Sequence, residues 1–227
     1  FQNIFKEFSS NVNPDYLLGK CYRTDPKTLM FAHALGMGLF EEPKIRWLEE
    51  KEWRECGYNY FKDDDSKIHL SREPLRRFED LDSDYQSIKI IKDNDIVRST
   101  LNTILSIHEE NPTVGPDDIG IIFLDRDNSI YELANTLEFR IKDEIKWDVN
   151  KAYETKVKKN DSGKIFISNR NNVKGLEFPF VICITKRISK NPTYRNTIYT
   201  MISRSFLKTY LILPNSTDSG FSQGIED

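Results

Sequence analysis

The pattern of apolar and polar residues is most regular between Ser87 and Pro214. SIKII (87–91) predicts a strand, residues 93–111 repeat apolar positions at helical spacing behind an Asp cap, and DIGIIFLD (118–125) is a nearly continuous apolar run. A strand, a helix and a buried strand in this order make a βαβ unit. Strands that are apolar on both faces indicate a parallel sheet covered by helices.

The same alternation continues toward the C-terminus. We expect helices at 129–142 and 192–206, and strands at 163–168, 178–185 and 209–214. The polar stretch 143–164 holds an NDSG turn and is interpreted as a surface connection. The predicted fold class is therefore α/β.

The N-terminal part is less regular. Residues 24–40 start with a Thr or Asp cap and Pro26, which predicts a helix, and residues 44–57 predict a second helix that stops at Gly57. The stretch 58–84 contains an acidic DDDS turn and fits either a small hairpin or a loop-rich insertion. The tail 215–227 is rich in Ser, Gly and Asp and is expected to fray.

Composition places the chain among soluble globular proteins. It is 38% hydrophobic and 30% charged, and it has no apolar run near the roughly 18 residues that a membrane span requires. Its three cysteines have neither disulfide-framework nor zinc-site spacing. A cytoplasmic protein without a metal site of its own and without a membrane partner is expected.

The net charge of −3 is not that of an obligate nucleic-acid binder, so any strand contact has to be local. Basic residues gather in two groups, which are ordinarily interpreted as solvated faces. The groups are Lys151, Lys156, Lys158 and Lys159, and then Lys186, Arg187, Lys190 and Arg195.

No complete active site can be assembled from the motifs of this chain. The G-x-x-x-x-G-K-[ST] loop that wraps a triphosphate is absent, as are the H-E-x-x-H and G-x-S-x-G patterns. If the chain takes part in catalysis, it supplies one part of a shared site.

Three separated segments carry a resemblance to UvrD/Rep/PcrA-type superfamily 1 DNA helicases. LLGKCYRTDPKTLMFAHAL (17–35) resembles motif IV, NVKGLEFPFVICI (172–184) is similar to motif V, and IYTMISRSFLKTYLIL (198–213) is similar to motif VI. The opening QNIF (2–5) resembles the latter half of motif III. The chain is therefore expected to be a fragment that starts within motif III.

The resemblance implies the second RecA-like (P-loop NTPase-type) domain of that family, a parallel sheet flanked by helices. Residues 1–43 would hold the motif III remnant and the start of motif IV, and residues 44–86 a small insertion. Residues 87–214 would hold the rest of the domain with motifs V and VI, ahead of the flexible tail 215–227.

By the same matching, the resemblance assigns roles in a nucleotide site shared between two lobes. ATP and Mg²⁺ would be bound mainly by the missing N-terminal lobe, which is the expected partner within the same protein. Matched catalytic residues are Arg204, Arg23 and Gln2, and matched nucleotide-binding residues are Glu177, Gly175, Lys174 and Tyr22. Without the motif context, arginines at helix ends are usually surface or ion-pairing residues.

Single-stranded DNA is the expected nucleic-acid partner, with RNA as the alternative. Where the family carries T-x-H-x-A ahead of K-G-L-E-F, this chain has Asn169 to Val173, so Arg170 or Asn171 would hold a strand phosphate. The function implied is the C-terminal motor domain of an ATP-dependent helicase, inactive by itself. A degenerate protein-binding scaffold and a non-unwinding translocase of a nuclease or defence system remain alternatives.

Overall fold

The structure is a computed structural model that describes residues 24–72, 85–125, 127–153 and 162–215. These residues divide into two units. The smaller contains Leu48–Arg72, and the larger contains the described residues before and after it. Gln2, Tyr22 and Arg23 lie outside the described residues.

Six strands form the parallel sheet of the larger unit, in the order β3-β8-β7-β4-β6-β5. The strands are β3 (Ile88–Lys92), β4 (Ile119–Phe123), β5 (Asp148–Lys151), β6 (Lys164–Asn169), β7 (Phe178–Ile184) and β8 (Ser205–Leu213). All five residues of β4 are buried, because β4 pairs with β6 on one side and β7 on the other. The predicted α/β class with a parallel sheet is confirmed.

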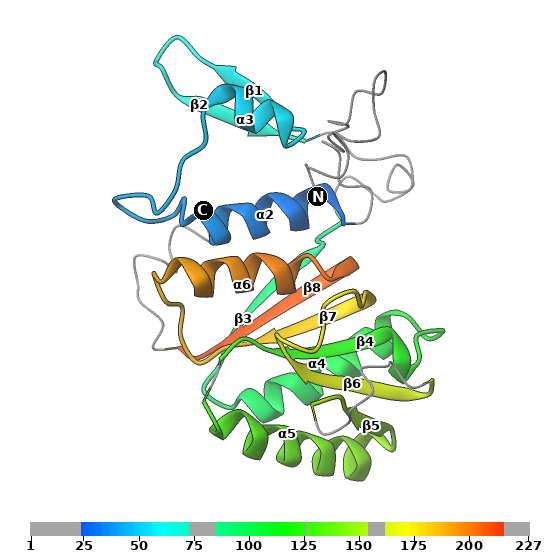
Figure 1. The fold of residues 1–227 in the computed structure, drawn as a ribbon. Coiled ribbons are helices and arrows are strands. Elements are labelled where there is room, and N and C mark those ends of the chain that lie inside the picture. Colours follow the sequence, from blue (N-terminus) through cyan, green and yellow to red (C-terminus); the bar gives the residue numbers. More distant parts are fainter. Residues whose placement is uncertain (1–23, 73–84, 126, 154–161, 216–227) are drawn as a thin grey trace, which may run out of the picture. The chain divides into compact units, whose positions relative to one another are not determined.

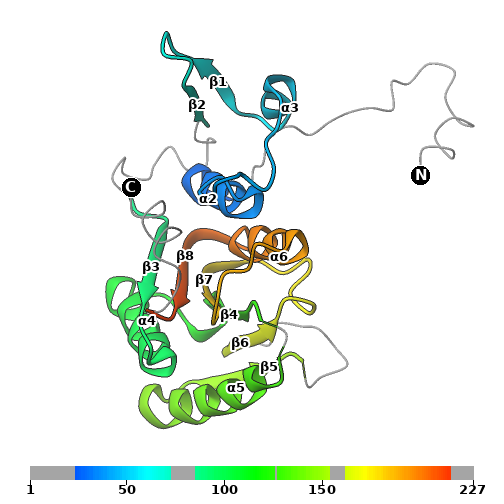
Figure 2. The same cartoon turned by 90° about the vertical axis from the view of Figure 1, so that its left-hand side faces the viewer.

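Helices cover both faces of this sheet (Figure 1). α4 (Ile96–Glu110) and α5 (Ser129–Arg140) pack on one face through side chains such as Ile104 and Leu137. α2 (Pro26–Met37) and α6 (Pro192–Ile202) pack on the other through Leu35 and Ile198. The same two layers are visible in the turned view of Figure 2.

Short polar side chains fix where three of these helices begin. The Asp25 carboxylate accepts a hydrogen bond from the Thr28 N–H at 3.1 Å, and the Asp95 carboxylate accepts one from the Arg98 N–H at 2.9 Å. Asn191 accepts the Thr193 N–H at 2.9 Å ahead of α6. Each cap satisfies a backbone donor that the helix itself leaves without a partner.

The smaller unit contains α3 (Glu50–Glu55) and an antiparallel hairpin of β1 (Asn59–Lys62) and β2 (Ile68–Ser71). Of the two forms expected for residues 58–84, the described part is therefore a hairpin. Trp53 is fully buried and meets the Tyr58 ring edge-on, with 5.0 Å between ring centroids. Together with Leu48, which is also buried, this aromatic pair forms the core of the unit.

Three assignments predicted from the sequence are wrong: the extents of two helices and the interpretation of one polar stretch. The helix expected at 44–57 forms only over Glu50–Glu55, and the helix expected at 192–206 ends at Ile202 because the next strand already starts at Ser205. The polar stretch 143–164 includes the edge strand β5, which pairs with β6 from Asp148 opposite Lys164.

Arg195 corrects the interpretation of the second basic group as a solvated face. Its side chain is 1% exposed and is ion-paired with Glu41, whose side chain is 5% exposed. Its Nη1 also donates to the Leu35 carbonyl oxygen at 3.1 Å. Arg195 therefore ties α6 to α2 and to the segment that follows α2.

No helix within the described ranges has the length and apolar character needed to cross a membrane.

Candidate functional site

Glu177 and Arg204 lie side by side at the edge of the sheet where β7 and β8 begin. Glu177 directly precedes β7 and Arg204 directly precedes β8. The N–H of Phe178 donates to the carbonyl oxygen of Arg204 at 3.1 Å, which holds the two strand starts together. The parallel register thus joins residues from two segments that are separate in the sequence.

The start of β7 is positioned by close packing. Gly120 of β4 lies under the Phe178 ring, and a Cβ at residue 120 would come within 2.7 Å of Phe178 Cδ2. Phe178 is 1% exposed and also packs on Phe166, with 5.1 Å between ring centroids. Glu177 is therefore followed by Phe178, a residue that packing holds in place, and it is preceded by a tight turn.

That turn contains Lys174 and Gly175. Gly175 has a φ of +84°, a conformation in which glycine is favoured, and the Leu176 N–H donates to the Val173 carbonyl oxygen at 3.1 Å. Val173 is buried, whereas Lys174, Gly175 and Glu177 are exposed. The turn consequently presents three of the sequence-predicted nucleotide-binding residues on the surface.

Arg204 is half-buried at the end of α6. Its Nε donates to the Thr200 carbonyl oxygen at 3.0 Å, and its backbone N–H donates to the Met201 carbonyl oxygen at 3.1 Å. A cation beside the last carbonyls of a helix is favoured by the helix dipole. The stem of Arg204 is therefore fixed by the last turn of the helix.

Thr24 brings the motif IV segment to the same edge. Its hydroxyl donates to the carbonyl oxygen of Ser203, the residue before Arg204, at 3.1 Å. Arg23 immediately precedes Thr24 but lies outside the described residues, as do Tyr22 and Gln2. Among the described residues, the structure thus brings together Glu177, Arg204 and the position next to Arg23.

Arg170 and Asn171 lie at the opposite edge, after the carboxyl end of β6. Asn171 is exposed and its N–H donates to the Asn169 side-chain oxygen at 3.0 Å. Arg170 is 7% exposed, and its Nη1 donates to the Thr197 hydroxyl of α6 at 3.3 Å. Of the two predicted strand-binding residues, one is a surface residue and the other is largely buried.

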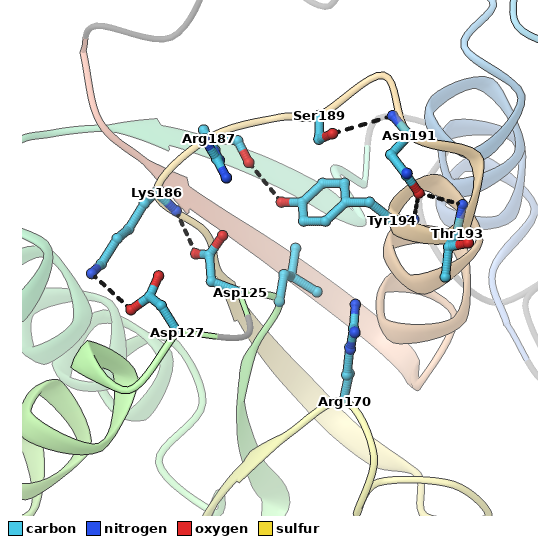
Figure 3. A pocket seen from close by; sticks show the side chains of 10 residues that line it. Asp125, Asp127, Arg170, Lys186, Arg187, Ser189, Asn191, Thr193 and Tyr194 are labelled. Atoms are coloured by element: carbon cyan, nitrogen blue, oxygen red, sulfur yellow. Dashed lines mark hydrogen bonds and ion pairs between the residues drawn. The ribbon is translucent and has the colours of Figure 1, made fainter.

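A cavity of about 820 Å³ lies beside Arg170 (Figure 3). The segments after β4, β6 and β7 and the start of α6 surround it, which places it at the carboxyl ends of parallel strands, where ligands of open α/β sheets bind. The sequence alone does not predict this cavity, although several of its lining residues come shortly after predicted strands. Its lining residues are Leu124, Asp125, Asp127, Arg170, Lys186, Arg187, Ser189, Asn191, Thr193 and Tyr194.

The two carboxylates of the cavity differ in their environment. Burial raises the pKa of Asp125 above its ordinary value and outweighs the hydrogen bond that Asp125 accepts from the Lys186 N–H at 2.7 Å. The hydroxyl of Ser129 lowers the pKa of the exposed Asp127, which also forms an ion pair with Lys186 Nζ at 3.4 Å. Both carboxylates therefore already have protein partners.

Within the described residues, no group of three or more His, Cys, Asp or Glu side chains is arranged to hold a metal ion. The described residues therefore do not fit a Mg²⁺ site.

A comparison with protein families matches one part of this sheet to a known domain. Residues 164–212 match the UvrD-like helicase C-terminal domain. This segment runs from β6 into β8. It contains Arg170, Asn171, Lys174, Gly175, Glu177 and Arg204.

The resemblance to UvrD-like helicases is therefore confirmed for the segment that carries motifs V and VI. A solved structure of the C-terminal domain of a possible DNA helicase from Lactobacillus plantarum is 16% identical, with a TM-score of 0.44. The match covers 61% of this chain and 80% of that one. A comparison with curated proteins gave no significant match.

Proposed function

We propose that this UvrD-like helicase C-terminal domain completes the ATP site of a superfamily 1 DNA helicase motor. The observation that supports the proposal is the hydrogen bond from the Phe178 N–H to the Arg204 carbonyl oxygen, at 3.1 Å. It sets an acidic and a basic residue next to each other at one edge of the sheet. Thr24, the residue that follows Arg23, is held at the same edge by its hydrogen bond to the Ser203 carbonyl oxygen.

Arg204 would act on the γ-phosphate of ATP bound by the N-terminal lobe. Phosphoryl transfer places negative charge on the γ-phosphate oxygens, and a guanidinium stays charged and binds such oxygens in a fork. Arg23 would be a second cation at this phosphate. Gln2 would contact the γ-phosphate or the attacking water.

Glu177 would accept a hydrogen bond from a ribose hydroxyl of the nucleotide. Its carboxylate is exposed on the same edge as Arg204, beyond the tight turn at Gly175. Lys174 and Gly175 would shape that turn, and Tyr22 would lie at the edge of the nucleotide. Mg²⁺ and the triphosphate would be held by the other lobe, so the isolated domain is expected to hydrolyse nothing.

Single-stranded DNA would bind at the opposite edge through Arg170 and Asn171, with RNA as the alternative. Closure of the two lobes on ATP and their opening after hydrolysis would then move the strand. The arrangement of the two edges supports this division, because α6 runs from the cavity beside Arg170 to Arg204.

Steady-state ATP hydrolysis by the full-length protein, with and without single-stranded DNA, tests the proposal. We expect single-stranded DNA to stimulate ATP turnover. We expect Arg204→Ala to lower that turnover by about 10³-fold, the lower end of the range for an arginine finger. Arg98→Ala is the matched control, since Arg98 is a surface residue of α4 that pairs with Glu144. Turnover that ignores both the strand and Arg204 would favour a protein-binding scaffold.

A further inference from the structure

Buried hydrogen bonds link the start of α2 to the last turn of α6. The Ser87 hydroxyl donates to the Asp25 carboxylate at 2.6 Å, and the Thr209 N–H donates to the Ser87 carbonyl oxygen at 2.8 Å. The Thr209 hydroxyl then donates to the carbonyl oxygen of Ile202, the last residue of α6, at 3.1 Å. Ser87 directly precedes β3, and Thr209 lies in the neighbouring strand β8. We call Asp25, Ser87 and Thr209 the polar network.

The side chains of the polar network are shielded from water. Asp25 is 8% exposed, Ser87 is 1% exposed and Thr209 is 0% exposed. Asp25 also accepts the Thr28 N–H at 3.1 Å and so caps α2. Burying a polar group costs free energy unless it is hydrogen-bonded, and a satisfied network in a low-dielectric interior holds its members in one arrangement. The polar network is therefore a rigid connection within the domain.

Three consecutive carbonyl groups at and before Arg204 are held from outside the last turn of α6. The carbonyl oxygens of residues 202, 203 and 204 each accept a hydrogen bond from a different segment of the chain. Their donors are, in order, the Thr209 hydroxyl, the Thr24 hydroxyl and the Phe178 N–H, each at 3.1 Å. The main chain that leads into Arg204 is thus fixed by the start of α2, by β7 and by β8.

The place of the Arg204 side chain depends on the place of this main chain. Its Nε donates to the Thr200 carbonyl oxygen at 3.0 Å, within the last turn of α6. A misplacement of about 1 Å can cost about 10²-fold in rate when the displaced group stabilises a transition state. Because Arg204 would act on a phosphate bound by another lobe, its rate effect depends on how the last turn of α6 is held.

We infer that Asp25, Ser87 and Thr209 are positioning residues, which hold the main chain of Arg204 in place for the transition state of ATP hydrolysis. The inference rests on the proposed function for the role of the Arg204 guanidinium. It adds residues that would act through Arg204 and not on the nucleotide itself. Ser87 lies outside the three segments that resemble helicase motifs.

Two substitutions at Thr209 separate positioning from packing. Thr209→Val keeps the shape of the side chain and removes the hydroxyl, whereas Thr209→Ser keeps the hydroxyl and removes a methyl group. In steady-state ATP hydrolysis by the full-length protein with single-stranded DNA, Thr209→Val is expected to lower kcat about 10-fold and to change KM for ATP less than about 2-fold. Thr209→Ser should restore most of the kcat that Thr209→Val loses.

A buried hydroxyl elsewhere in the domain provides the matched control. Thr103 is 4% exposed, and its hydroxyl donates to the Ser99 carbonyl oxygen in α4 at 2.7 Å. Thr103→Val should leave kcat unchanged. An equal fall in kcat for Thr103→Val and Thr209→Val would overturn the inference, because a general loss of buried hydrogen bonds would then explain both.

Ser87→Ala breaks the network at a second point and leaves the Asp25 cap of α2 in place. It is expected to lower kcat in the same way as Thr209→Val, and it keeps the inference testable if circular dichroism shows that Thr209→Val does not fold. Parental kcat in the folded network variants would overturn the inference.

A double-mutant cycle with Arg204→Ala identifies the residue through which the network acts. In single-turnover hydrolysis, adding Thr209→Val to Arg204→Ala should lower the remaining rate less than about 2-fold, because the two substitutions act on one group. A full further loss of about 10-fold would mean independent effects and would overturn the inference. If Arg204→Ala is slow and the network variants are not, only this inference fails. Parental turnover in Arg204→Ala would overturn the proposed function and this inference with it.

Discussion

The hydroxyl of Thr24 donates a hydrogen bond to the carbonyl oxygen of Ser203 at 3.1 Å, across 179 positions of sequence. The bond joins the start of α2 to the turn that follows α6. At the other end of these two helices, Arg195 Nη1 donates to the Leu35 carbonyl oxygen at 3.1 Å. Helices α2 and α6, which lead away from Arg23 and toward Arg204, are thus joined by a hydrogen bond at each end.

Thr24→Val should remove the hydrogen bond between Thr24 and Ser203. Thr24 is 1% exposed, so losing its hydroxyl leaves the Ser203 carbonyl without that donor and should lower the free energy of unfolding by about 1 kcal/mol. Urea unfolding of the full-length protein measures the loss. Thr136→Val is the control, because the Thr136 hydroxyl bonds the Glu132 carbonyl on the exposed side of α5. Equal stability of both variants would mean that the Thr24 contact contributes nothing.

Arg195→Met should cost far more, because it leaves Glu41 buried beside a neutral side chain. Burial lowers the pKa of Arg195 to about 10, which still leaves the guanidinium protonated at neutral pH. Removing one partner of a buried ion pair costs about 3–5 kcal/mol, whereas an exposed pair contributes under about 1 kcal/mol. The comparison is with Arg98→Met, which breaks the exposed pair with Glu144. Similar unfolding free energies for the two variants would contradict a structural role for Arg195.

Glu177→Gln should act on nucleotide binding through the sugar. Loss of a charged acceptor for a ribose hydroxyl is expected to raise KM for ATP about 10-fold. It should leave KM for 2′,3′-dideoxy-ATP unchanged, since that nucleotide lacks the hydroxyls. Glu109→Gln, an exposed residue of α4, serves as the control. An equal rise in KM for both nucleotides would contradict the ribose contact.

Asp125→Asn should change how stability depends on pH. Because burial raises the pKa of Asp125 above 3.8, the folded state binds more protons than the unfolded state. The contribution of Asp125 to stability therefore falls as pH rises from 3.8 through the raised value. Asn cannot ionise, so the unfolding free energy of the variant should rise relative to that of the parent over that pH window. Acid unfolding curves measure this difference. A difference in unfolding free energy between Asp125→Asn and the parent that stays constant with pH would contradict the shift.

The central sheet could be predicted from the sequence because its strands are buried on both faces. The continuous apolar runs that became β4 and β7 are readable without tertiary information. β5 is different: it is four residues long at the sheet edge, and its sequence DVNK gives little apolar signal. Its strand conformation follows from pairing with β6, which the local sequence does not show.

Element ends were predicted less well for a similar reason. Residues at Ile198 to Phe206 continue a helical pattern, yet Ser205 already pairs with Phe178 in the sheet. Tertiary pairing overrides the helical preference there. The same pairing puts Arg204 in a turn beside Glu177 instead of on a helix.

The two edges of the domain were predictable to different degrees. Glu177 and Arg204 were predicted from their motifs because each precedes an apolar strand in a recognisable segment, and their roles stay predictions. The cavity beside Arg170 depends on β4 lying between β6 and β7, an order that the sequence does not give. The sequence alone therefore does not associate Asp125, Lys186 and Arg187 with Arg170.

The most direct test of the central claim is single-turnover ATP hydrolysis by full-length Arg204→Ala, with ATP binding measured on the same sample. If Arg204 completes a site held mainly by the other lobe, ATP should still bind while the hydrolysis step slows by about 10³-fold. Arg98→Ala should match the parent in both measurements. Hydrolysis at the parental rate in folded Arg204→Ala would contradict the account.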